Sequence, residues 1–74
     1  MDYRQAQKAF TRYKGALTRL QRKTPVDHTA IVALWPAMVA EFDRNDWPLP
    51  DDWRRFERAA EDSTYRLQVD ANRL

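Results

Sequence analysis

Apolar side chains recur at spacings of three and four residues in three stretches of this chain, which proline-containing turns separate. The positions expected to face a core in the first stretch are Tyr3, Ala6, Phe10, Tyr13, Leu17 and Leu20. Those of the second stretch are Ile31, Leu34, Trp35, Met38, Val39 and Phe42, and those of the third are Trp53, Phe56, Ala60, Thr64, Leu67, Ala71 and Leu74. This spacing places side chains on one face of an α-helix, whereas a half-buried strand would alternate with a period of two. The pattern therefore predicts three amphipathic helices and no strand.

Capping residues and prolines set the expected ends of the first helix. It is expected over about residues 2–23, with Asp2 as its N-cap. Thr24 precedes Pro25, and a residue before proline is disfavoured in helical backbone. The first helix is therefore expected to stop before this pair.

The next two helices follow from similar signals. The second helix is expected over about residues 25–45, because Thr24 can cap its start and Pro25 suits the first helical position. A later start at Thr29 is the alternative. The third helix is expected over about residues 50–73, where two acidic residues in the first turn favour the exposed N–H groups.

Pro36 lies inside the second helical pattern. Proline removes one hydrogen bond and clashes with the carbonyl group four residues back, so we expect a kink or a break at Pro36. The chain has 74 residues, a single glycine and short expected connections. We therefore expect one domain over residues 1–74, all-α in class, with the architecture of an antiparallel three-helix bundle.

Residues that commonly carry catalysis or bind metals are scarce. The chain has no cysteine, and its one histidine, His28, is expected to be a surface or capping residue at a helix start. Glu57 and Glu61 share a helix face but lack the partner histidine that carboxylate metal sites in bundles use. No glycine-rich phosphate loop is present. We expect no enzyme, and no cofactor, metal or small-molecule substrate.

The apolar stretches are also too short for a membrane protein. No apolar run approaches the roughly 20 residues that cross a bilayer, and charged residues lie where a signal peptide would need apolar ones. We expect a soluble intracellular protein, located in the cytoplasm and without a membrane partner.

Basic residues gather on one side of the first expected helix. Residues 1–24 carry seven basic residues and one acid, a balance of +6, whereas residues 25–74 carry six basic and ten acidic residues, a balance of −4. At about 100° per residue, six of the basic side chains fall within an arc of roughly 100° that holds no acid. We call these residues the basic stripe: Arg4, Lys8, Arg12, Arg19, Arg22 and Lys23.

The basic stripe predicts an acidic partner, either nucleic acid or an acidic protein surface. The aromatic residues of the same helix face the opposite side, so binding is expected to be mainly to phosphates, sensitive to salt and weakly selective for sequence. The other interpretation is that the stripe is a solvated face, neutralised by the acids that follow residue 25. Nucleic-acid binding by a non-enzymatic protein is the leading prediction.

The second expected helix indicates a rival surface. Eleven consecutive non-polar residues run from Ala30 to Ala40, so the outward face is as apolar as the inward one. A helix that is apolar all round usually has a partner, which predicts a homodimer or a role as a protein adaptor, inhibitor or assembly subunit. Because exposed alanine costs little, the same face is also compatible with a monomer. The predicted protein-interface residues are Val32, Ala33, Pro36, Ala37, Ala40 and Trp47.

Trp47 lies in the turn between the second and third expected helices. Burial of its large ring would let it cap the end of the bundle, and we favour this position. The alternative is an exposed anchor of the kind enriched in interaction hot spots.

Overall fold

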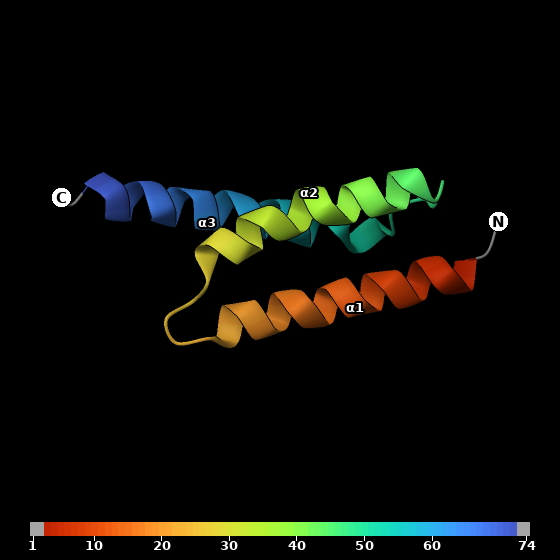
Figure 1. Cartoon of the computed structure of the whole chain (residues 1–74), viewed down its shortest axis with the longest axis horizontal. Helices are drawn as coiled ribbons and strands as arrows, with labels where there is room; N and C mark the ends of the chain where they lie inside the picture. The colour runs from red at the N-terminus through yellow and green to blue at the C-terminus, as the bar shows by residue number, and fades with distance from the viewer. Residues whose placement is uncertain (1–2, 73–74) are drawn as a thin grey trace.

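Three α-helices make up most of the chain in a computed structural model that describes residues 3–72. α1 spans Tyr3–Arg22, α2 spans His28–Arg44, a 3₁₀ turn η1 spans Asp51–Trp53, and α3 spans Arg54–Asn72. α2 packs against both α1 and α3, and Figure 1 shows an elongated molecule with α1 below α2. Its extents are 49 × 20 × 17 Å. The prediction of three packed helices is confirmed, with no strand in the described range, and the positions predicted for Asp2 and Leu74 lie outside it.

The start of α2 differs from the prediction. The helix begins at His28, so neither Thr24 nor Thr29 caps it and Pro25 lies in the preceding loop. Asp27 is the N-cap, and its Oδ1 atom accepts a hydrogen bond from the backbone N–H of Ala30 at 3.1 Å. A carboxylate here satisfies a free N–H group and carries the negative charge that a helix start favours, which explains the later start.

Pro36 lies inside α2 and does not end it. The helix continues from His28 to Arg44, so of the two predicted alternatives the break at Pro36 does not occur and the kink stays a prediction. Pro36 is exposed, and the apolar positions on both sides of it keep the same phase toward the core. Packing of this face against the other helices therefore maintains the helix despite the missing hydrogen bond.

The end of α2 is a Schellman turn. The N–H of Trp47 donates to the carbonyl of Phe42 at 2.9 Å, and the N–H of Asp46 donates to the carbonyl of Asp43 at 3.1 Å. Asp46 has φ = 57°, the left-handed conformation that such a turn requires and that glycine usually supplies. The turn thus satisfies carbonyl groups at the helix end and brings Trp47 back toward α2.

Aromatic rings form the centre of the core. Phe10 of α1 meets Phe42 of α2 and Phe56 of α3 edge to face, with ring centroids 6.4 Å and 5.4 Å away. Trp35 and Trp53 stack at 5.5 Å with nearly parallel rings and are half-buried. The buried apolar residues are Ala6, Ala9, Phe10, Leu17, Ile31, Met38, Phe42, Phe56, Ala59 and Ala60.

The buried face of α3 is shorter than the predicted one. Ser63 is the last buried residue, whereas Thr64, Leu67 and Ala71, which were predicted to face the core, are exposed. Figure 1 shows the reason: the C-terminal part of α3 extends past the loop that joins α1 and α2, so no neighbouring helix covers it. At the other end of the bundle, the prediction that Tyr3 faces the core is also wrong, since 64% of this residue is exposed.

Candidate nucleic-acid interface

All six residues of the basic stripe are exposed. Five of them lie on α1, and Lys23 directly follows this helix. Because α1 is one uninterrupted helix over Tyr3–Arg22, the spacing of these residues keeps them on one side. The structure therefore provides the surface on which the sequence-based prediction depends, while contact with a partner stays a prediction.

Acids from the rest of the chain reach only part of the basic stripe. Arg12 pairs with Glu41 of α2 at 2.7 Å, and Lys23 pairs with Asp27 at 3.8 Å. Lys8, Arg19 and Arg22 form no ion pair with any residue in the range 3–72. Neutralisation within the fold thus accounts for two stripe residues and leaves these three side chains facing solvent.

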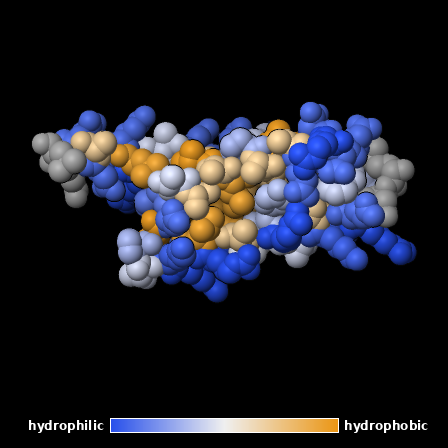
Figure 2. Space-filling model, in the orientation of Figure 1, coloured by the Kyte–Doolittle hydropathy of each residue, from blue (hydrophilic) through white to orange (hydrophobic). Residues whose placement is uncertain are grey.

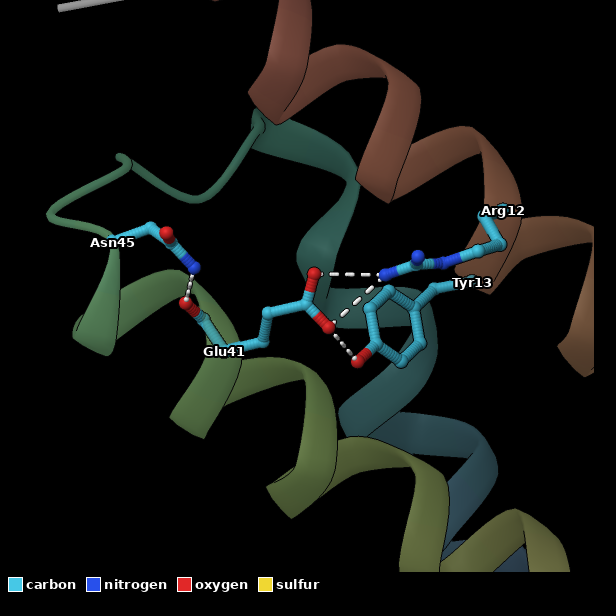
Figure 3. A network of polar contacts seen from close by, with 4 residues as sticks. All are labelled: Arg12, Tyr13, Glu41 and Asn45. Atoms are coloured by element: carbon cyan, nitrogen blue, oxygen red, sulfur yellow. Dashed lines mark hydrogen bonds and ion pairs between the residues drawn. The ribbon is translucent and has the colours of Figure 1, made fainter.

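Glu41 joins α1 to α2 through two side chains, as Figure 3 shows. The Arg12 guanidinium donates to both carboxylate oxygens, at 3.0 Å and 2.7 Å, and the Tyr13 hydroxyl donates to Oε1 at 2.7 Å. The hydrogen bond from Tyr13, together with the hydrogen bonds and positive charge of Arg12, lowers the pKa of Glu41. Burial, followed by the hydrogen bond to Glu41 and its negative charge, raises the pKa of Tyr13. The network therefore holds Glu41 ionised and Tyr13 neutral at neutral pH.

Two shallow grooves lie along the first half of the stripe. One, of about 400 Å³, is lined by Arg4, Gln7, Lys8 and Thr11. The other, of about 330 Å³, is lined by Gln5, Lys8, Ala9, Arg12, Glu41 and Trp47, and we call it the Trp47 groove. Lys8 lines both grooves, so a polyanion that crosses from one to the other would pass this ammonium group.

The sequence left two positions open for Trp47, a buried ring that caps the end of the bundle or an exposed anchor. Its ring packs edge to face on Phe42 at 5.5 Å, and it is half-buried, as expected of a residue that caps the bundle end. It also lines a groove with two stripe residues, although sequence analysis found no aromatic residue beside the stripe. The only sequence signal was its place in a proline-containing turn, and this signal does not specify which helix the turn approaches.

The predicted protein-interface residues on α2 lie at the surface. Ala33, Pro36, Ala37 and Ala40 are exposed, and Val32 is half-buried. Figure 2 shows apolar surface over the middle of the molecule, where α2 crosses in Figure 1, and this surface continues toward the C-terminal part of α3, whereas the opposite end is mostly hydrophilic. Nothing in the structure identifies a partner for this face, so association through it stays a prediction.

His28 differs from the expected surface or capping residue. It is half-buried, and its Nδ1 atom lies 3.0 Å from the hydroxyl oxygen of Ser63, which is 3% exposed. This contact links the start of α2 to α3. His28 and Ser63 also line a pocket of about 260 Å³ between the two helices.

Two searches of the described residues bear on other classes of function. No group of three or more histidine, cysteine, aspartate or glutamate residues within the range 3–72 has the arrangement of a metal site. None of the helices in this range has the length and apolar character needed to span a bilayer.

No protein family, curated protein or solved structure gives a significant match to this chain. The fold and the surface therefore define the molecule as a small three-helix protein with a basic face on α1.

Proposed function

We propose that this protein is a non-enzymatic binding protein that engages nucleic acid through the phosphate groups, with the basic stripe as its contact surface. The observation that carries the proposal is the exposure of Lys8, Arg19 and Arg22, none of which forms an ion pair with another residue of the described range 3–72. Unmatched cations on one side of a helix attract a polyanion and release its counterions on binding.

The length of the stripe suits an extended polyanion. Lys8 and Arg22 are separated by about 21 Å along a helix that rises 1.5 Å per residue. Each strand of a duplex carries one phosphate per about 3.4 Å of the duplex axis, so several phosphates can lie within the length of the stripe. The cytoplasmic location predicted from the sequence belongs to this proposal.

Two details of the helix arrangement are also proposals. We infer that the helices run antiparallel, which is supported by the pairing of Arg12, in the first half of α1, with Glu41, near the end of α2. We also infer a bend at Pro36, because proline cannot donate the hydrogen bond that a straight helix uses. Residual dipolar couplings of the α2 amide groups, measured on either side of Pro36, would be fitted by one straight axis if the bend is absent.

Charge reversal in the stripe tests the proposed function. Lys8→Glu combined with Arg19→Glu is expected to weaken binding to a fluorescein-labelled DNA at low salt by about 100-fold, because two phosphate contacts become repulsive. Neither residue forms an ion pair within residues 3–72, so the fold is expected to persist. Fluorescence anisotropy measures the affinity across a salt titration.

The matched control is Arg58→Glu combined with Arg66→Glu, on exposed positions of α3. Both double variants change the net charge from +2 to −2, since each replaces two positive by two negative charges. The control is expected to weaken binding much less than the stripe variant. Equal losses would show that only net charge matters, and undetectable binding of DNA and RNA by the unmodified protein would refute the proposal.

A second candidate function is association of two copies through the outer face of α2. It is favoured by the exposure of Ala33, Pro36, Ala37 and Ala40, whose small side chains let another helix approach closely. Ala37→Glu is expected to convert a dimer to a monomer, because it would bury an unpaired carboxylate in the interface. Sedimentation velocity over a range of concentrations measures this, and a monomeric unmodified protein at the highest concentration would exclude a homodimer.

A further inference from the structure

The turn after α2 fixes the position of an indole ring beside the basic stripe. The hydrogen bond from the N–H of Trp47 to the carbonyl of Phe42, at 2.9 Å, returns the chain toward α2. The ring then packs edge to face on Phe42, with centroids 5.5 Å apart. Because Phe42 is buried in the core, its ring gives Trp47 a fixed surface to pack on.

The Trp47 groove combines an aromatic surface with cations. Gln5, Lys8, Ala9 and Arg12 line it from α1, Glu41 lines it from α2, and Trp47 lines it from the turn. Lys8 has no ion pair within the described range, whereas the charge of Arg12 is matched by Glu41. A cation next to an aromatic ring is the combination that proteins use for single-stranded nucleic acid, in which phosphates meet cations and bases stack on rings.

We propose that the Trp47 groove binds one nucleotide of a single-stranded nucleic acid, with the base against Trp47 and the adjacent phosphate at Lys8. This inference rests on the proposed function and adds to it a contact that only single strands can make. The volume of about 330 Å³ accommodates one base and its sugar, while the rest of the strand continues along the basic stripe.

The groove distinguishes single strands from duplexes. In a duplex each base is paired and stacked on its neighbours, so a ring at the protein surface reaches only the backbone. A flexible single strand can turn one base outward to lie on Trp47. The basic stripe contributes to both forms, whereas Trp47 contributes only to the single strand.

Glu41 is the one acid of the groove, and its charge does not prevent an anion from binding. Its carboxylate accepts two hydrogen bonds from Arg12 and one from Tyr13, so its negative charge is compensated within the fold. The phosphate is therefore placed at Lys8, which has no ion pair among the residues that the structure describes, rather than at Arg12.

Fluorescence of Trp47 tests the proposed contact directly. The chain has three tryptophans, and Trp35→Phe combined with Trp53→Phe leaves Trp47 as the only one. Titration of this variant with an oligothymidylate of about ten nucleotides is expected to quench its emission, because a stacked base quenches an indole. The control is Trp47→Phe, which retains Trp35 and Trp53 and whose emission is expected to stay unchanged on binding.

A second variant measures how much Trp47 contributes to the selectivity for single-stranded over duplex DNA. Trp47→Leu keeps an apolar side chain against Phe42, and it is expected to weaken oligothymidylate binding by about tenfold, the effect of one lost base stack. Its affinity for a duplex is expected to be unchanged. Anisotropy of labelled single-stranded and duplex DNA gives both affinities under the same salt conditions.

The outcomes separate this inference from the proposed function. If oligothymidylate binds while the emission of Trp47 stays constant, or if Trp47→Leu weakens single-strand and duplex binding equally, the groove does not hold a base although the stripe still binds nucleic acid. If the unmodified protein binds neither form at low salt, the proposed function fails and this inference fails with it.

Discussion

Phe10→Ala is expected to lower the free energy of unfolding by about 3–5 kcal/mol, the usual cost of removing a buried aromatic ring. The ring is buried, and it is the aromatic contact of α1 with both Phe42 and Phe56. A domain of this size has a small core, and its total stability is expected to be near the lower end of the range of about 5–15 kcal/mol. The variant should therefore retain only about 0–2 kcal/mol of stability at 25 °C, so that a measurable fraction of it is unfolded without denaturant.

Urea unfolding followed by far-ultraviolet circular dichroism measures this loss. Phe10→Leu is the matched control, because it retains an apolar side chain of similar volume and is expected to cost less than about 1.5 kcal/mol. A loss below 1.5 kcal/mol for Phe10→Ala would contradict the packing of α1 described above.

Glu41→Gln is expected to lower the free energy of unfolding at pH 7 by about 1–2 kcal/mol, the contribution of hydrogen bonds to a charged group. The side chain of Glu41 is 22% exposed, so solvent screens its interactions only in part. Glu57→Gln, at an exposed position of α3, is the control and is expected to change stability by less than about 0.5 kcal/mol.

The effect of Glu41→Gln depends on pH in a defined direction. The folded state lowers the pKa of Glu41 below its ordinary value of 4.5, so the ionised carboxylate stabilises the fold above this value. As the pH falls through the lowered pKa, this stabilisation is lost and the difference between the two proteins should shrink. Urea unfolding across this acidic range measures the difference, and a gap that stays constant would contradict the assigned role of Glu41.

Tyr13 acts in the same network at the opposite end of the pH scale. Its pKa is raised above 10.0, so the fold favours the neutral phenol. This contribution is present below pH 10 and is lost as the pH rises through the raised pKa. Acid and alkali therefore weaken this polar network between α1 and α2 in different ways, acid by protonating Glu41 and alkali by ionising Tyr13.

The helices and most of their core residues were predictable because the pattern that specifies them is local. Phe10, Met38, Phe42 and Phe56 lie at spacings that any helix converts into one face, and all four are buried. The exposed basic stripe was predictable for the same reason. Its residues are on one helix, so their common side depends on no distant contact.

Features that depend on where another element ends were not predictable. Leu67 fits the apolar phase of α3 but is 37% exposed, since α1 and α2 turn away before reaching it. The Trp47 groove requires a left-handed residue at Asp46, a position that sequence patterns usually assign to glycine. The start of α2 depended on a choice among Thr24, Asp27 and Thr29, which are all good caps.

Because Glu41 forms an ion pair with Arg12, its carboxylate competes with any phosphate ligand for this guanidinium group. A phosphate that approaches this side of the Arg12 guanidinium must displace a carboxylate that already accepts two hydrogen bonds from the Nη2 atom, at 3.0 Å and 2.7 Å. Affinity gained at Arg12 is therefore offset by stability lost between α1 and α2, so the two quantities cannot be optimised together at this residue. In evolution or in design, tighter binding of polyanions is more readily reached through Lys8, Arg19 and Arg22, which form no ion pair within the described part of the chain.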